Sequence, residues 1–397
     1  MPRDYVPADI AGLGFDPELR DMLHNEPVAR VRLAYGQGEA WIVTRYEDVK
    51  FVTSDARFSR AAVIGAPTPL MTKHRIPADR AVSFSDPPEH ARVRRVVAKA
   101  FAQRNVEQIR RRTELTLNDL VDAMLAAGPP ADIIGHVTSP FPMAVVGELL
   151  GIPQTEHAWL TDCATTVLTK TRDQAAVDRV NRIKSDVSAY FLAQAERRRT
   201  EPRDDLLTVL AEARDRGEID DEELTALTLL VALNGWHGVR NNSSNMVYLL
   251  LTEPGLQERL LTEPGAVPRA VEELLRFIPH KNGVGIPRIA TEDVDIRGVR
   301  IRAGDVVHVS YVCANWDPEV FAEPERIDID RPDVQHLAFG HGTHYCMGPL
   351  LARMEQQLLM STLLNRLPSL RLAVAPDEVR WQPDALIRGP VELPVEW

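Results

Sequence analysis

The stretch Phe339-Gly340-His341-Gly342-Thr343-His344-Tyr345-Cys346-Met347-Gly348 decides the fold, and Pro349 to Leu358 follow it with the pattern of an amphipathic helix. A glycine-rich loop thus presents one cysteine directly before a helix. The helix dipole and the free backbone N–H groups at such a terminus stabilise a thiolate, and the glycines let the backbone fold closely around the sulfur. An isolated cysteine is more often a small buried hydrophobic residue, but Cys346 lies in the uninterrupted pattern F-G-x-G-x-H-x-C-x-G, which suits a heme iron ligand.

On this pattern the chain resembles the cytochrome P450 superfamily, the heme-thiolate monooxygenases, from about residue 27 to the C-terminus. The resemblance implies a triangular, mainly α fold with small β-sheets, in which heme b (iron protoporphyrin IX) lies between a long distal helix and the cysteine loop. It implies that Cys346 binds the iron and that Phe339, Gly340 and Gly348 contact the cofactor. It also implies one domain over residues 1–397, β-rich at about 27–60 and 283–310 and helical elsewhere.

Composition and charge narrow the class of protein. The formal net charge is −11, from 46 Lys and Arg against 57 Asp and Glu, which argues against nucleic-acid binding. The N-terminus lacks the basic and apolar regions of a signal peptide, and no apolar run is long enough to span a bilayer. The three cysteines lack the spacing of a disulfide framework or a zinc site. We therefore expect a cytoplasmic monomer that does not bind membranes.

Hydrophobic periodicity predicts the order of the elements. A β-hairpin is predicted between residues 28 and 44, followed by a short helix from Tyr46. Residues 60–86 are irregular and rich in Pro, Ala and Gly; the resemblance implies a mobile loop that roofs the substrate pocket. Asp86 can cap a helix that begins at Pro87-Pro88 and runs to about residue 102. Further helices are predicted at 106–127, 140–150, 155–171 and 175–199.

Several basic residues are candidates for contact with the heme propionates. His90 and Arg94 lie four residues apart and therefore on one face of their helix. The resemblance implies that both bind a propionate, as do Arg288 in the segment 285–290 and His344 in the cysteine loop. The remaining cations of this region are Arg92, Arg95, Lys99 and Arg104, and we interpret them as the solvated face of a basic helix. Such a basic patch can also steer an acidic ferredoxin.

A long helix from Asp220 or Asp221 to Leu251 is predicted, and it resembles the helix that crosses the distal heme face. It places Asn234-Gly235-Trp236-His237-Gly238 where most members of the family have a small residue, Gly, any residue, an acid and a threonine. The acid and the alcohol relay protons during oxygen activation. Here water, substrate or His237, with an ordinary pKa of about 6.5, must do so, unless His237 is turned away from the iron. We predict Trp236, His237 and Gly238 as catalytic residues.

An E-x-x-R motif precedes the cysteine loop. Glu273 and Arg276 lie one turn apart on a predicted helix, and the motif resembles the buried ion pair behind the heme. A third partner is expected between residues 317 and 335. There, Pro324-Glu325-Arg326-Ile327 matches the family's P-E-R-F with one change, so Arg326 is predicted, with Arg331 as the alternative.

Three stretches, at residues 39–43, 336–340 and 393–397, resemble the cyclodipeptide-oxidising branch that includes mycocyclosin synthase. With the missing relay, this implies oxidative C–C or C–N coupling of an aromatic cyclic dipeptide, preferably tryptophan-containing and including dimerisation. The electrons would come from NAD(P)H through ferredoxin reductase and ferredoxin, and the oxidant would be O2. The alternatives are hydroxylation of a macrolide, terpenoid or steroid, and a heme-binding sensor without turnover. Substrate contact is predicted for Val82, Gly235, Val284, Ile286 and Ile387.

Overall fold

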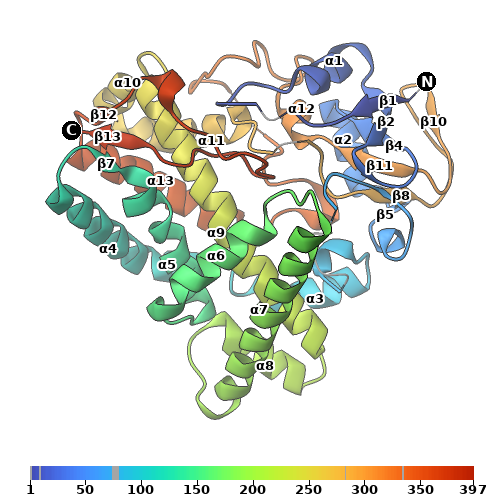
Figure 1. The fold of residues 1–397 in the computed structure, drawn as a ribbon, viewed down its shortest axis with the longest axis horizontal. Helices are drawn as coiled ribbons and strands as arrows, with labels where there is room; N and C mark the ends of the chain where they lie inside the picture. Colours follow the sequence, from blue (N-terminus) through green and yellow to red (C-terminus); the bar gives the residue numbers. More distant parts are fainter. Residues whose placement is uncertain (1, 9, 74–79, 282, 333–334) are drawn as a thin grey trace.

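The computed structural model describes the chain except residues 1, 9, 74–79, 282 and 333–334, and it is mainly helical with small sheets (Figure 1). The helices are α1 (Pro17–Asn25), α2 (Tyr46–Ser54), α3 (Glu89–Ala98), α4 (Gln103–Ala127), α5 (Pro140–Leu150), α6 (His157–Val167), α7 (Gln174–Thr200), α8 (Leu206–Asp215), α9 (Asp221–Thr252), α10 (Leu256–Thr262), α11 (Val267–Phe277), α12 (Tyr311–Asn315) and α13 (Pro349–Arg366). The strands are β1 (Arg3–Tyr5), β2 (Val28–Leu33), β3 (Tyr35–Gly36), β4 (Ala40–Val43), β5 (Phe58–Ser59), β6 (Pro69–Leu70), β7 (Ala131–Asp132), β8 (Arg288–Ala290), β9 (Val294–Ile296), β10 (Val299–Ile301), β11 (Val306–Val309), β12 (Arg371–Leu372) and β13 (Pro394–Glu396).

The largest sheet has the strand order β1-β2-β4-β11-β8-β5. The predicted hairpin is confirmed, since β2 and β4 pair antiparallel with Val31 opposite Ala40. Strand β11 then pairs parallel with β4 and antiparallel with β8, which joins the N-terminal strands to the segment after α11. The hairpin connection makes a second contact, because Gly36 pairs with β6. Its φ is +80°, and a Cβ atom there would lie 2.1 Å from the carbonyl oxygen of Thr68, so only glycine fits.

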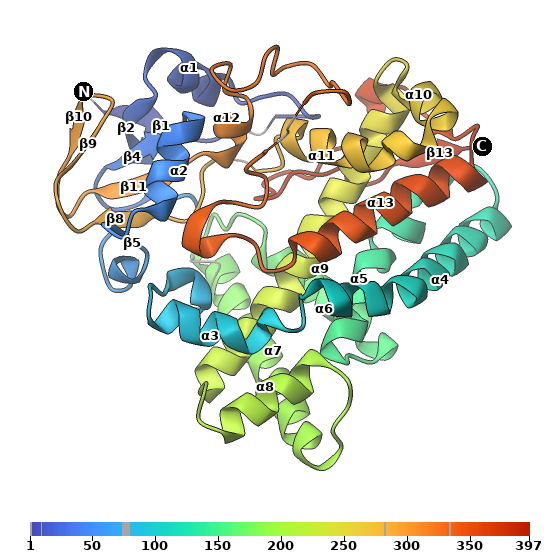
Figure 2. The same cartoon turned by 180° about the vertical axis from the view of Figure 1, so that it is seen from behind.

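Helix α9 confirms the predicted long helix and crosses the whole molecule, between α5, α6 and α7 on one side and α11 and α13 on the other (Figures 1 and 2). A capping box begins it. The Asp220 carboxylate accepts a hydrogen bond from the Glu223 N–H at 2.8 Å, and the Glu223 carboxylate accepts one from the Asp220 N–H at 3.1 Å. Because the middle of α9 is buried on nearly every side, its apolar periodicity does not single out the face that meets the active site.

Asp86 does not cap α3, contrary to the prediction. Its carboxylate instead accepts hydrogen bonds from the backbone N–H groups of Arg60 and Ala61, at 3.1 and 3.2 Å. It therefore fastens the turn after β5 to the start of α3. The helix begins at Glu89 and ends at Ala98, earlier than predicted.

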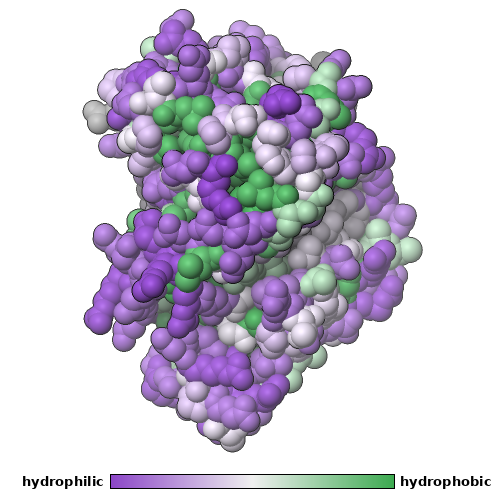
Figure 3. Space-filling model, turned by 90° about the vertical axis from the view of Figure 1, so that its left-hand side faces the viewer, coloured by the Kyte–Doolittle hydropathy of each residue, from purple (hydrophilic) through white to green (hydrophobic). Residues whose placement is uncertain are grey.

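The loop that carries Cys346 lies between α3 and α13. Figure 2 shows it passing above α3 before α13 runs alongside α4. Among the described residues, no helix combines the length and the apolar character needed to cross a bilayer. On the face in Figure 3, hydrophobic side chains gather mainly in the upper half, whereas the lower end, formed by α7 and α8, is mostly hydrophilic.

Candidate active site

Cys346 lies at the wall of a cavity of about 350 Å³ between α9 and the loop before α13. Two glycines with positive φ shape this loop, Gly340 at +76° and Gly342 at +69°. A Cβ atom at Gly342 would lie 2.2 Å from the carbonyl oxygen of Thr53, so glycine is required there. The Cys346 N–H donates to the Phe339 carbonyl at 2.9 Å, which closes the loop.

The groups around the Cys346 thiol shift its pKa in opposite directions. Burial raises its pKa, whereas the Gly348 N–H, Arg94 and Arg353 act in the opposite direction. A thiol with a raised pKa becomes a permanent thiolate when a metal cation binds it.

Most of the predicted cofactor-binding residues meet at this cavity. His90, Arg94, Phe339, His344, Cys346 and Gly348 line it. Arg94 also braces the loop, because its guanidinium donates to the Thr343 carbonyl at 3.1 Å. The rings of His90 and His344 lie edge to face, 4.5 Å apart. Burial lowers the pKa of His90 to about 4 and that of His344 to about 2, so both rings are neutral at physiological pH and can each donate one hydrogen bond.

Arg288 supplies the clearest test of whether heme fits. Its side chain is 1% exposed, and neither Nη1 nor Nη2 has a hydrogen-bond partner. A buried guanidinium without an acceptor is costly, and a heme propionate is a carboxylate that Arg288 can bind. Arg288 is not among the residues that line the cavity, but it lies close enough to the lining residues Arg60 and His344 to lower, in addition to burial, the pKa of both, so this group of residues fits the cofactor.

Arg60 is a cavity residue that the sequence reasoning missed. It lines the same cavity, and its Nη1 donates to the Ser83 carbonyl at 3.2 Å. Burial and then the neighbouring Arg288 lower its pKa to about 9. In the sequence, it is one cation in an irregular stretch, and no spacing marks it.

One face of α9 forms the distal wall. The residues of α9 that line the cavity are Leu230, Val231, Asn234, Gly235, Gly238, Val239 and Asn242. Gly238 thus lies where it was predicted, and a Cβ atom there would meet nothing within 4 Å, whereas one at Gly235 would lie 2.9 Å from Val146 Cγ2.

Trp236 and His237 of α9 do not line the cavity. The Trp236 indole N–H donates to the Ser139 carbonyl at 2.9 Å, and the His237 ring packs against the indole at 5.6 Å between ring centroids. Successive helix residues point about 100° apart, so Trp236 points away from Asn234 and Gly238, whereas His237 lies at the edge of their face and is not among the residues that line the cavity. Burial, and then Arg240, lower the pKa of His237 to about 3. Neither residue therefore lies where Gly238 does, at the cavity wall, and their predicted catalytic role has no support from the cavity lining.

A second cavity of about 370 Å³ adjoins the first. Val284, Ile286 and Ile387 line it as predicted, while Val82 and Gly235 line the cysteine cavity instead. The residues shared by both cavities are Ser83, Leu230, Asn234, Lys281 and Ile387. The described parts of segment 60–86 form one wall of the second cavity, and the predicted mobility of this segment falls partly on residues 74–79, which lie outside the described residues.

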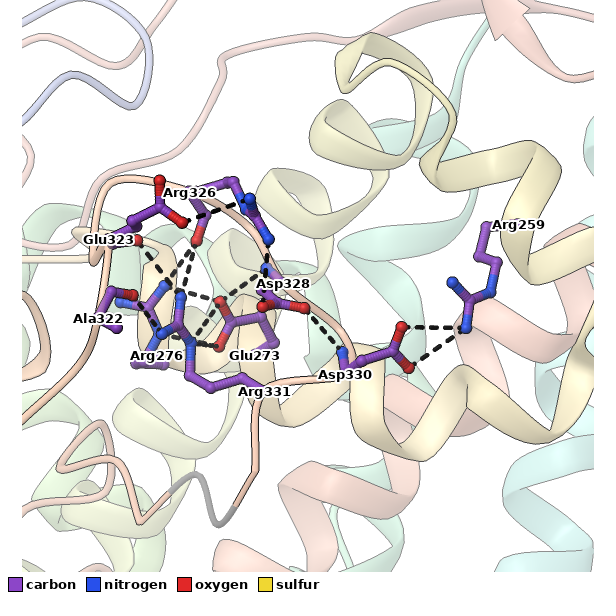
Figure 4. Close-up of polar contacts among 9 residues, drawn as sticks. All are labelled: Arg259, Glu273, Arg276, Ala322, Glu323, Arg326, Asp328, Asp330 and Arg331. Carbon is purple, nitrogen blue, oxygen red and sulfur yellow. Dashed lines mark hydrogen bonds and ion pairs between the residues drawn. The ribbon is translucent and has the colours of Figure 1, made fainter.

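The E-x-x-R pair forms behind the cysteine loop as predicted (Figure 4). Arg276 Nη2 and Nε lie 2.7 and 2.8 Å from the two Glu273 oxygens, and both side chains are at most 1% exposed. The prediction of Arg326 as third partner is wrong, because its guanidinium is exposed and faces Glu323 and Asp328. Arg331, the alternative, contacts Glu273.

A neighbouring ion pair was missed. Two guanidinium nitrogens of Arg353 on α13, Nε and Nη2, donate to Glu272 at 2.7 and 2.9 Å, and His336 Nε2 lies 3.1 Å from the same carboxylate. The Arg353 guanidinium also stacks over the Phe339 ring at 4.6 Å. This cluster ties α11 to the cysteine loop. In the sequence, the only sign of this ion pair is the acidic residue Glu272 directly before Glu273.

The family model described as Cytochrome P450 matches residues 162–386. This chain belongs to the cytochrome P450 family. Biflaviolin synthase of Streptomyces coelicolor is 41% identical over 399 residues, covering 100% of this chain and 96% of the relative. Mycinamicin IV hydroxylase/epoxidase of Micromonospora griseorubida is 41% identical over 397 residues, covering 100% and 99%. The crystal structure of cytochrome P450mel 107F1 with biaryl coupling reactivity superposes with a TM-score of 0.96 at 45% identity, over 100% of both chains.

These relatives confirm the predicted fold and cofactor. The protein is a P450 of the bacterial type, and heme b is the cofactor of this family. The names of these relatives refer to natural products, so this chain belongs among the P450s of secondary metabolism.

Proposed function

We propose that this P450 couples aromatic substrates oxidatively, forming a C–C or C–N bond. In this proposal Cys346 would bind the iron, and His90, Arg94, Arg288 and His344 would contact the propionates. The observation that carries the proposal is the distal face of α9. This helix is described in full, and none of its residues that line the cysteine cavity has a carboxyl or hydroxyl group.

The open space at Gly238 determines what this face of α9 can accommodate next to the cofactor. When bound, heme supplies the activation of O2. A threonine at position 238 would project into the cavity, whereas glycine leaves room for water and for a flat aromatic group. Coupling depends on holding two reacting positions close together, and the chain supplies apolar walls and distal space for that purpose.

Two kinds of resemblance support aromatic coupling. A structural relative has biaryl coupling reactivity, and a sequence relative is named biflaviolin synthase. For the substrate we retain an aromatic cyclic dipeptide, preferably tryptophan-containing and including dimerisation, because residues 39–43, 336–340 and 393–397 resemble the branch that oxidises such rings. Hydroxylation is the second candidate, since a hydroxylase/epoxidase is equally similar in sequence.

Ferredoxin and ferredoxin reductase are the proposed electron donors, with NAD(P)H and O2 as cosubstrates. Arg95, Lys99 and Arg104 are exposed on the α3 side of the heme cavity and suit an acidic partner. Arg92 contributes less, because it pairs with Glu223 at the start of α9.

Product mass tests the proposal. The purified protein, ferredoxin, ferredoxin reductase and NADPH are incubated with a panel of aromatic cyclic dipeptides, with the Cys346→Ser variant as control. Coupling yields a product that has lost two hydrogens, from one molecule or from two joined molecules. A product that gains one oxygen instead would establish hydroxylation. A protein that consumes no NADPH with any substrate would be a sensor.

A further inference from the structure

The second cavity is mostly apolar, so each polar group on its wall has a large effect on what binds there. Two such groups have hydrogen-bonding capacity that the described protein does not use. They are the ammonium of Lys281, after α11, and one ring nitrogen of His308, on β11.

Lys281 lies where the two cavities meet and lines both of them. Its backbone is fixed, because it forms a β-bridge with Ile387. Its ammonium has no hydrogen-bond or ion-pair partner among the described residues. Burial, together with the nearby Arg60, lowers the pKa of Lys281, while Tyr311 acts in the opposite direction. The ammonium is therefore a donor without an acceptor.

His308 supplies the complementary group. Its ring is 2% exposed, and Nδ1 lies 2.8 Å from the Gly285 carbonyl oxygen. A carbonyl can only accept, so Nδ1 carries the proton in this contact. The other nitrogen, Nε2, is then an acceptor in the neutral ring, and it is buried without a partner.

We propose that Lys281 and His308 each recognise one polar group of the substrate, a carbonyl oxygen at Lys281 and an N–H or O–H group at His308. Lys281 donates to the carbonyl, and His308 Nε2 accepts from the donor. The ring of a cyclic dipeptide presents both kinds of group, and so does an aromatic hydroxy-ketone. The inference rests on the proposed function and adds to it the chemistry by which the site selects its substrate.

A wall of this kind rejects ligands that lack the matching groups. A protein donor or acceptor that stays buried without a partner costs more than a hydrogen bond gains, and sites built to bond an N–H or O–H group discriminate strongly against analogues without it. Lys281 also lines the cysteine cavity, so a heme propionate is the competing partner for its ammonium. The test must therefore separate substrate binding from heme binding.

The test measures ligand affinity by calorimetry on the heme-loaded protein. The first ligand pair is cyclo(L-Trp-L-Trp) and its derivative methylated on both amide nitrogens of the diketopiperazine ring. The second pair is 2-hydroxy-1-tetralone, whose hydroxyl stays protonated at neutral pH, and its methyl ether. Methylation removes the donor and keeps the carbonyls. We expect it to weaken binding to the wild type by about tenfold or more for the pair that matches the substrate, and to have little effect on binding to His308→Phe.

Lys281→Met tests the donor. It should weaken binding of the unmethylated ligand by about tenfold or more while heme content stays at the wild-type level. Lys50→Met, the same change on the surface of α2, should bind like the wild type. The proposal is overturned if methylation weakens binding equally in the wild type and in His308→Phe, if Lys281→Met loses heme without a specific loss of ligand affinity, or if neither ligand pair binds. Product mass is independent of these affinities, so the coupling proposal stands or falls separately.

Discussion

Arg331 Nε lies 3.2 Å from Glu273 Oε2, and this contact completes the buried charge cluster behind the cysteine loop (Figure 4). The Arg331 side chain is 8% exposed, whereas that of Arg326 is 62% exposed. Arg326 takes part through its backbone alone, since its carbonyl accepts from Arg276 Nη2 at 3.1 Å. One carboxylate therefore serves two arginines, and Arg276 in turn holds the carbonyls of the segment between α12 and the cysteine loop.

The first prediction compares the three arginines by alanine substitution. Arg276→Ala should lower the free energy of unfolding by about 3 to 5 kcal/mol, because it leaves the Glu273 charge buried. Arg331→Ala should lower it by about 1 to 3 kcal/mol, the cost of a lost charged hydrogen bond. Arg326→Ala should change it by less than about 0.5 kcal/mol, as exposed substitutions do. Denaturant unfolding of the heme-loaded variants measures the order, and an Arg326→Ala effect as large as that of Arg331→Ala would contradict it.

The second prediction uses two glycines of α9 as a matched pair. Gly235→Ala brings a Cβ atom to 2.9 Å from Val146 Cγ2, and valine is too stiff to move aside easily. Gly238→Ala meets no protein atom within 4 Å and gains the helix propensity of alanine, worth about 1 kcal/mol. Gly235→Ala should therefore unfold more readily than the wild type in thermal unfolding, and Gly238→Ala should not. Equal destabilisation by both would show that the two faces of α9 are equally packed.

Local patterns explain why some of this could be predicted from sequence. The glycines around Cys346, the E-x-x-R spacing and the β2–β4 alternation each act within a few residues, and the structure forms all three elements. The rotation of α9 about its own axis could not be predicted in this way, because no local pattern marks the side that faces the cavity. Its middle is buried on nearly all sides, so hydrophobicity does not distinguish the face of Gly238 from the face of His237.

Long-range partners were equally hidden from the sequence. Arg326 is the arginine of the P-E-R pattern and Arg331 lies five residues after it, and only the path of the chain after Pro324 decides which guanidinium reaches Glu273. Lys281 and His308 belong to segments that meet only in the folded molecule, and no spacing links them. Such residues are found by asking which buried polar atoms lack a partner.

The third prediction concerns acid stability. Burial alone would raise the pKa of Glu272, but hydrogen bonds from His336 and Arg353 outweigh it and lower the pKa to about 2, against an ordinary value of 4.5. A lowered carboxyl pKa stabilises the folded state fully above the ordinary value, and the contribution is lost as pH falls toward the folded-state value. The difference in unfolding free energy between the wild type and Glu272→Gln should be constant from about pH 7 to 5 and shrink below about pH 4.5.

Chemical unfolding at several pH values measures this difference. Glu258→Gln, at an exposed position of α10, is the matched control and should follow the wild type at every pH. A wild-type advantage over Glu272→Gln that persists unchanged down to pH 3 would mean that the carboxylate charge is not what stabilises the contact between α11 and α13.

The last prediction asks whether His237 moves protons. Its ring is 3% exposed and its pKa is lowered to about 3, so it stays neutral across the pH range in which a free histidine titrates, near 6.5. It is also not among the residues that line either cavity. His237→Phe keeps the aromatic contact with Trp236, and it should therefore leave the pH profile of NADPH oxidation unchanged between pH 6 and 8. Asn234→Ala changes a residue that does line both cavities, and it should alter the fraction of NADPH oxidation that yields product. If His237→Phe removed an ionisation near pH 6.5 from the profile, the ring would have to reach the cavity during turnover, and α9 would have to rotate or unwind around Trp236 to allow it.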